Sequence, residues 1–134
     1  MKILIADDEI AYRKTLEIIL KPFGDVHQSH NGADAVRRYR EALFSDKPFD
    51  LVFLDIKMPQ MDGQEALVAI RKLEREKYGR DNDAPRAVII MATTMDDPHY
   101  VMDTFLRGNC DAYINKPVTK ELVMEKLRMA HLLS

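Results

Sequence analysis

The chain has 134 residues, of which 46% are hydrophobic and 31% are charged, with 20 Lys and Arg against 22 Asp and Glu. That length is typical of one domain, and a chain of this size buries roughly two-thirds of its unfolded surface. The nearly balanced charge argues against nonspecific nucleic-acid binding and is typical of an ordinary globular protein.

The N-terminal sequence MKILIADDE reaches acidic residues after only a few apolar ones, which is too soon for a signal peptide. No apolar run approaches the length that crosses a membrane. We therefore expect a cytoplasmic protein with no nucleic-acid partner and no membrane association. The single cysteine, Cys110, excludes an internal disulfide and has no CxxC or histidine neighbour at metal-binding spacing.

The first half of the chain alternates short apolar runs with segments of helical period. Residues 2–6, 25–29 and 50–54 predict three strands. Between them, apolar residues recur at the i, i+3, i+4, i+7 spacing of an amphipathic helix, and Tyr12 with the charges of AYRKTLE (11–17) is expected on the exposed side. The apolar stripes of the two predicted helices are Leu16, Ile19, Leu20 and Phe23, and then Val36, Tyr39 and Leu43.

The second half of the chain continues the same alternation. Residues 87–92 and 111–115 predict two further strands, and residues 74–86, which contain Gly, Asn, Asp and Pro, predict a mobile surface loop. Strict alternation of strands and helices predicts an α/β fold, an open doubly wound parallel sheet with helices on both faces. The stripes of the last three predicted helices are Ala66, Ile70 and Leu73, then Val101, Met102, Phe105 and Leu106, and finally Val123, Leu127 and Ala130.

Polar residues stand at the carboxyl ends of four of the five predicted strands, where a sheet of this kind binds its ligand. Carboxylates crowded at one edge repel each other unless a cation lies between them, and oxygen ligands suit Mg²⁺ better than zinc. A lysine and a hydroxyl facing such a cation supply what a transferring phosphoryl group needs. The residues are Asp7, Asp8 and Glu9, then Asp55, then Thr93 and Thr94, and finally Asn115, Lys116 and Pro117.

Each of these features has a simpler explanation when taken alone. An acidic run before a helix is commonly an N-terminal cap, and a lone Asp at a strand end more often caps a turn. A Lys-Pro pair after a strand usually marks only a turn. These explanations do not predict that all the features arrive together at the ligand edge of one sheet, so their combination favours a phosphoryl-transfer site.

Three motifs resemble the receiver domain of two-component response regulators. ILIADDE is similar to its acidic pair, LVFLDIKMPQMDG to its phosphoacceptor strand and following loop, and DAYINKP to its aromatic, lysine and proline strand end. The resemblance covers the whole chain. It implies one receiver domain over residues 1–134 without an effector domain, of the stand-alone chemotaxis-regulator type. The implied fold is flavodoxin-like, with strand order 2-1-3-4-5 and five helices.

The resemblance also implies roles for individual residues. Asp55 would accept a phosphoryl group from a histidine kinase or a histidine phosphotransfer protein. Mg²⁺ would be bound by Asp8, Asp55 and the backbone carbonyl of Lys57, with Asp7 acting through water. Lys116 would pair with a phosphoryl oxygen, and the peptide bond that follows it is expected to be cis.

The switch hydroxyl has two candidates. The pattern of an apolar strand followed by a threonine favours Thr93, which we choose, whereas counting back from Lys116 favours Thr94. On phosphorylation, the resemblance implies that the hydroxyl and Tyr113 move inward, which changes the face made by the fourth helix, fifth strand and fifth helix. A downstream protein target would bind this face, and Tyr113 could instead be a plain core residue.

Three kinds of function fit these residues. The leading hypothesis is a phosphorylation switch that works as a monomer or weak dimer through protein contacts. A second is a receiver-like adaptor that is not phosphorylated. A third is an aspartate-based phosphatase or phosphotransferase, but such enzymes commonly carry a second acid two residues beyond the nucleophile, and here that position is Lys57.

Overall fold

The computed structural model describes residues 1–94 and 110–133, which contain one five-stranded parallel sheet of order β2-β1-β3-β4-β5. The strands are β1 (Lys2–Ala6), β2 (Asp25–Ser29), β3 (Leu51–Asp55), β4 (Val88–Thr93) and β5 (Ala112–Asn115). The described helices are α1 (Ile10–Leu20), α2 (Gly32–Phe44), α3 (Gly63–Tyr78) and α5 (Lys120–Met129), with a 3-10 turn η1 (Lys21–Phe23). The predicted fold class and strand order are confirmed, and every predicted strand agrees to within one residue at each end.

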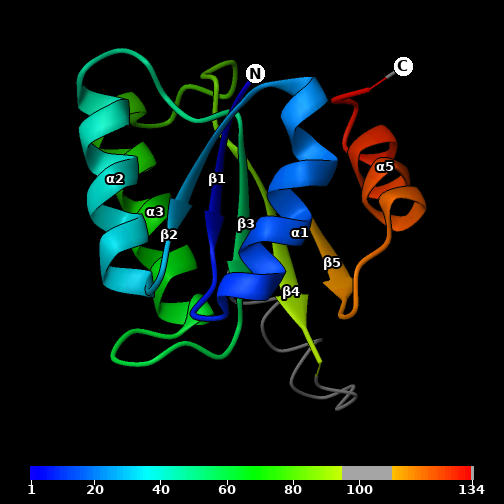
Figure 1. Cartoon of the computed structure of the whole chain (residues 1–134). Coiled ribbons are helices and arrows are strands. Elements are labelled where there is room, and N and C mark those ends of the chain that lie inside the picture. Colours follow the sequence, from blue (N-terminus) through cyan, green and yellow to red (C-terminus); the bar gives the residue numbers. More distant parts are fainter. Residues whose placement is uncertain (95–109, 134) are drawn as a thin grey trace.

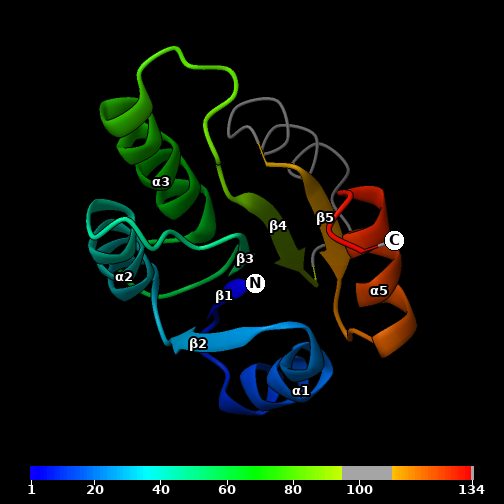
Figure 2. The same ribbon diagram turned by 90° about the horizontal axis from the view of Figure 1, so that it is seen from above.

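The sheet separates two hydrophobic cores. In Figures 1 and 2, α2 and α3 lie on one side of the sheet and α1 and α5 lie on the other. Because successive side chains of a strand point to opposite faces, Leu4 and Ala6 pack with α2 and α3, whereas Ile3 and Ile5 pack with α1 and α5. The central strand β3 is buried along its whole length, as a strand covered on both faces should be.

Two expectations about helix ends are wrong. Phe23 does not belong to the first helix, because Pro22 lacks an N–H and the chain tightens into η1 after Leu20. Residues 74–78 are not part of a loop, because α3 continues to Tyr78 and buries Glu74 completely. The fourth predicted helix, with Val101, Met102, Phe105 and Leu106, lies outside the described residues.

Within the two described stretches, none of the helices has the length and apolar character needed to cross a membrane.

Side-chain caps fix where three helices begin. Asn31 caps α2, Asp62 caps α3 and Thr119 caps α5, each accepting a hydrogen bond from the backbone N–H three residues further on. In α1 the residue before the first turn, Glu9, makes no such cap. Its backbone N–H instead donates to the Asp7 carboxylate at 2.8 Å, so the start of α1 is tied to the carboxyl end of β1.

The turn after β3 brings the start of α3 against the end of that strand. Gly63 N donates to the Ile56 carbonyl at 2.9 Å. A Cβ atom at Gly63 would lie 2.3 Å from the Asp55 carbonyl oxygen, which real Cβ contacts do not reach. Only glycine therefore allows the helix to begin this close to Asp55.

We expect Gly63→Ala to lower the free energy of unfolding by about 2 kcal/mol or more, because backbone atoms that cannot rotate away must shift to admit the methyl group. Denaturant unfolding measures the change. Val68→Ala, at an exposed position of the same helix, is the matched control and should change stability by less than about 0.5 kcal/mol. Equal stability of the two variants would show that the turn accommodates a side chain.

Candidate functional site

The carboxyl ends of four strands meet at one edge of the sheet, to which the arrowheads of Figure 1 point. Asp7 follows β1, Asp55 is the last residue of β3, and Thr93 is the last residue of β4. Lys116 follows β5, and its backbone N–H donates to the Thr93 carbonyl at 2.9 Å, which extends the ladder by one bond. The structure thus brings the sequence-predicted residues to one edge because the parallel register aligns the strand ends.

Three carboxylates form a cluster at this edge. Asp7, Asp8 and Asp55 each offer an oxygen, and these oxygens all lie within 4.8 Å of one another. Asp7 is fully buried and Asp55 is 7% exposed, whereas Asp8 is exposed and free to adjust. Ligand oxygens at roughly 2.1 Å from a Mg²⁺ ion are at most roughly 4.2 Å apart, so only a small shift separates the cluster from a cation site.

The ammonium group of Lys116 bridges two of these carboxylates. Its Nζ donates to Asp7 at 2.6 Å and lies 3.3 Å from an Asp55 oxygen, while its side chain is only 11% exposed. The peptide bond after Lys116 is cis, as expected. One positive charge therefore faces two buried acids.

The pKa values follow from this balance of burial and charge. Burial, and then the charge of Asp7, raise the pKa of Asp55 to about 6, although Lys116 and a hydrogen bond from the Lys57 backbone act in the opposite direction. Burial also raises the pKa of Asp7. Burial alone would lower the pKa of Lys116, but its contacts with Asp7 and Asp55 outweigh this and raise it. The cluster thus holds more negative charge than Lys116 neutralises.

Tyr12 also belongs to this site. Its expected place on the exposed side of α1 is wrong, because Tyr12, Leu16 and Leu20 at i, i+4 and i+8 form the buried stripe of the helix. Its ring centroid lies 4.2 Å from Lys116 Nζ, and its buried hydroxyl has no hydrogen-bond partner among residues 1–94 and 110–133. Burial, together with the charges of Asp7 and Asp55, raises the pKa of Tyr12 well above its usual range.

Tyr12 was missed because the charged residues Arg13 and Lys14 follow it directly. Only its four-residue spacing from Leu16 marks it as a core position. With Thr94, Lys116 and Pro117 it lines a cavity of about 360 Å³ beside the carboxylate cluster.

The remaining predicted residues are placed but their roles stay predictions. Thr93 is buried at the end of β4, whereas Thr94 is exposed, so the two candidate hydroxyls face different surroundings. Tyr113 is half-buried on β5 and packs against the core beneath α2 and α3. Lys57 exposes its side chain to solvent, which leaves its backbone as the part nearest Asp55.

Comparisons with known proteins agree along nearly the whole chain. A family model described as the response regulator receiver domain matches residues 3–128. The chain is 36% identical over 132 residues to the chemotaxis protein CheY of Listeria monocytogenes, covering 97% of this chain and 98% of that protein. It is 35% identical over 128 residues to CheY of Bacillus subtilis, covering 94% and 93%. The solved receiver domain of the histidine kinase CKI1 from Arabidopsis thaliana, complexed with Mg²⁺ and BeF₃⁻, has a TM-score of 0.78 and 30% identity, covering 95% and 89%.

We expect Asp55→Asn to stabilise the metal-free protein at neutral pH. An acid whose pKa rises on folding from 3.8 to about 6 costs stability once it is ionised in the folded state. The cost is absent below about pH 4, grows between about pH 4 and 6, and reaches roughly 2–3 kcal/mol above that.

Denaturant unfolding in a chelating buffer, repeated from about pH 4 to pH 8, measures this difference. The control is Asp83→Asn, at an exposed position in the α3–β4 loop, whose curve should run parallel to the wild-type curve. If the Asp55→Asn curve is also parallel, ionised Asp55 carries no such cost.

Proposed function

The chain belongs to the response regulator receiver domain family, whose members act as phosphorylation-dependent switches in two-component signalling, and we propose that Asp55 carries its phosphoryl group. The observation that supports this most directly is the position of Asp55 on the rigid end of β3, 3.3 Å from the Lys116 ammonium and within the carboxylate cluster. A nucleophile fixed in this way needs little reorganisation to attack.

The residues of the cluster fit Mg²⁺. Asp8, Asp55 and the Lys57 backbone carbonyl would hold the ion directly and Asp7 through water, since hard oxygen donors with excess negative charge are what the ion prefers. The Mg²⁺ and BeF₃⁻ complex of the Arabidopsis receiver domain supports this assignment. The bound ion would neutralise charge on the phosphoryl oxygens.

The phosphoryl transfer can be written with the residues in place. An Asp55 carboxylate oxygen forms a bond to phosphorus, the phosphorus–nitrogen bond of a phosphohistidine breaks, and its electron pair leaves on the imidazole nitrogen. Asp55 is ionised at neutral pH because its pKa of about 6 lies below 7. Lys116 would move from the carboxylate to a phosphoryl oxygen, where its charge opposes the charge that accumulates in the transition state.

The partners follow from this chemistry. A histidine kinase or a histidine phosphotransfer protein would donate the phosphoryl group. Thr93 and Tyr113 would then shift and present the face made by the fourth helix, β5 and α5 to a downstream protein. The likeness to CheY proteins and to a kinase receiver domain supports both kinds of partner.

Tyr12 would act as a positioning residue for Lys116. The ammonium contacts two carboxylates and lies 4.2 Å from the centroid of the Tyr12 ring, so the ring would limit how far Lys116 can move and would keep water from it. A desolvated contact between a cation and a ring contributes about 1–2 kcal/mol. The Tyr12 hydroxyl takes no part in this contact.

Intact mass after incubation with phosphoramidate and Mg²⁺ tests the proposed function. We expect the wild-type protein to gain the mass of one phosphoryl group only when Mg²⁺ is present. Asp55→Asn should gain none, because the acceptor oxygen is lost. The matched control Asp83→Asn, also an aspartate-to-asparagine change, should be labelled like the wild type.

A wild-type protein that stays unlabelled, while an unrelated receiver domain is labelled in the same tube, would contradict the switch and favour the adaptor. Labelling of Asp55→Asn would place the phosphoryl group on another residue.

We expect Tyr12→Leu to slow phosphorylation by phosphoramidate about 5- to 30-fold, because the cation contact is lost. Tyr12→Phe keeps the ring and should remain within about twofold of the wild type. The Tyr12 hydroxyl is buried without a hydrogen-bond partner in the described part of the chain, so removing it should also raise the free energy of unfolding by about 1 kcal/mol. Equal phosphorylation rates for Tyr12→Leu and Tyr12→Phe would show that the contact between the ring and Lys116 does not affect phosphorylation.

A further inference from the structure

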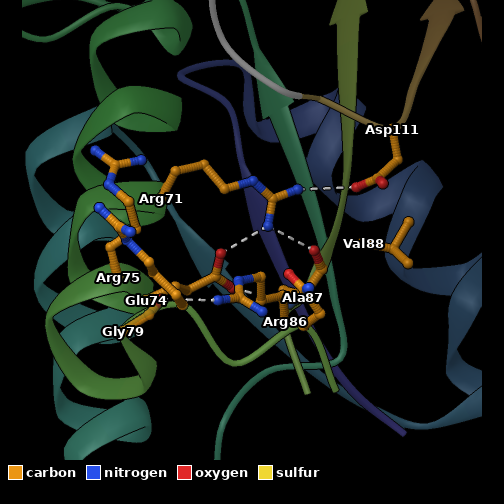
Figure 3. A pocket seen from close by; sticks show the side chains of 10 residues that line it. Arg71, Glu74, Arg75, Gly79, Arg86, Ala87, Val88 and Asp111 are labelled. Atoms are coloured by element: carbon orange, nitrogen blue, oxygen red, sulfur yellow. Dashed lines mark hydrogen bonds and ion pairs between the residues drawn. The ribbon is translucent and has the colours of Figure 1, made fainter. Parts of the chain in front are cut away.

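A second polar cleft lies at the opposite end of the strands from the carboxylate cluster, where β4 and β5 begin. It has a volume of about 720 Å³ and is bounded by the second half of α3, the loop after it, the start of β4 and the residue before β5 (Figure 3). It shares no residue with the carboxylate cluster. Its charged lining residues are Arg71, Arg75, Arg80, Arg86, Glu74 and Asp111.

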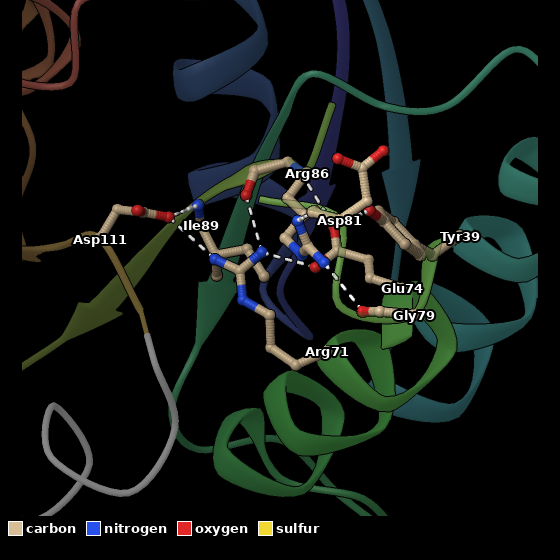
Figure 4. A network of polar contacts seen from close by, with 9 residues as sticks. Tyr39, Arg71, Glu74, Gly79, Asp81, Arg86, Ile89 and Asp111 are labelled. Carbon is tan, nitrogen blue, oxygen red and sulfur yellow. Dashed lines mark hydrogen bonds and ion pairs between the residues drawn. The ribbon is translucent and has the colours of Figure 1, made fainter. Parts of the chain in front are cut away.

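Both acids in the lining are engaged within the protein. Glu74 is fully buried and accepts hydrogen bonds from the Tyr39 hydroxyl, from Arg71 at 2.8 Å and from the Ala87 N–H at 2.9 Å (Figure 4). Asp111 accepts from a second nitrogen of Arg71 at 2.9 Å and from the Ile89 N–H at 2.8 Å. Arg71 therefore bridges the two acids, and neither acid pairs with the other arginines.

Arg86 is held in place without losing its charge. Its guanidinium donates to the carbonyl oxygens of Asp81 at 2.6 Å and Gly79 at 3.3 Å, and it lies 5.9 Å from the centroid of the Tyr78 ring. Carbonyl oxygens and a ring fix its orientation but carry no net negative charge. A guanidinium ordered in this way loses less entropy when it binds an anion.

Arg75 and Arg80 have exposed side chains and form no ion pair with the residues of 1–94 or 110–133. Arg75 lies one turn after Arg71 on the same face of α3, and a cation in the last turn also complements the negative end of the helix dipole. That explanation does not extend to Arg80 and Arg86, which lie beyond the helix end.

Among the residues that the structure describes, the lining thus has four positive and two negative side chains, in a chain whose formal net charge is −2. Guanidinium groups bind phosphate through paired hydrogen bonds, and the cleft is within the roughly 300–1,000 Å³ typical of small-molecule sites. We propose that this cleft binds a small anion with two or more phosphate groups, held by Arg75, Arg80 and Arg86. The site is independent of phosphorylation at Asp55.

Calorimetric titration with inorganic pyrophosphate, in Mg²⁺-free buffer at about 0.15 M salt, tests the proposal. The wild-type protein should show one saturable site, with amide shifts in nuclear magnetic resonance spectra along residues 71–88. Arg75→Gln/Arg80→Gln should weaken binding about tenfold or more, because two charge-assisted contacts are lost. Both side chains are exposed, so the folded spectrum and the melting temperature should be retained.

The matched control is Arg40→Gln/Arg128→Gln, which removes the same charge at exposed positions away from the cleft and should stay within about twofold of the wild type. Amide signals of the residues around Lys116 should stay in place, which distinguishes this cleft from the carboxylate edge. The proposal is overturned by an absence of saturable binding, by equal weakening in the two arginine pairs, or by shifts confined to the residues around Lys116.

Discussion

The ammonium group of Lys116 is the contact on which the arrangement of the carboxylate edge depends. It joins the end of β5 to Asp7 after β1 and to Asp55 on β3, across the middle of the sheet. Without a positive charge between them, two acids this deeply buried would repel each other and favour their protonated forms. The hydrogen bond from Lys116 N to the Thr93 carbonyl fixes the backbone of Lys116 relative to the end of β4, and so helps to position its charge. The backbone ladder therefore sets the electrostatics of the site.

The single positive charge of Lys116 does not neutralise the negative charge at the carboxyl ends of the strands. This excess negative charge suits a site that binds a cation during phosphorylation. The pKa values of Asp7 and Asp55 remain raised although Lys116 contacts both, so a further positive charge would be stabilised there. In the proposed mechanism, a phosphoryl group and a divalent cation that arrive together would change the local charge little and would give Lys116 a new partner. Lys116 would then have different partners in the unmodified and the phosphorylated protein. The ring of Tyr12 lies against the same lysine, and its hydroxyl has no hydrogen-bond partner among residues 1–94 and 110–133.

The parallel sheet and the residues of the carboxylate edge could be predicted from the sequence pattern, because strand ends are marked by sharp changes from apolar to charged residues. The strand order was implied only by the resemblance to receiver domains. Two wrong predictions concern residues whose sequence neighbours suggest exposure but whose side chains are buried. Tyr12 has charged neighbours along the chain but faces the core, and Glu74 is an acid whose burial depends on Tyr39 and Arg71, which are distant from each other in sequence. The local sequence pattern does not show which distant residues will pack against such a side chain. The sequence pattern does not decide between Thr93 and Thr94 as the switch hydroxyl for the same reason, since two adjacent threonines differ only in the direction in which their side chains point.

The amino ends and the carboxyl ends of the strands carry similar networks of charged side chains. At each edge one cation bridges two acids: Lys116 joins Asp7 and Asp55, and Arg71 joins Glu74 and Asp111. In both networks a backbone N–H also donates to each acid: Ala87 and Ile89 donate to Glu74 and Asp111, and Glu9 and Lys57 donate to Asp7 and Asp55. The planar guanidinium of Arg71 contacts its two acids through different nitrogens, and this network joins α3 to the starts of β4 and β5. Around Lys116, the cation is a flexible ammonium, and the acids retain raised pKa values. The Arg71 network thus ties the starts of β4 and β5 to α3, whereas the unneutralised negative charge lies at the carboxyl ends of the strands.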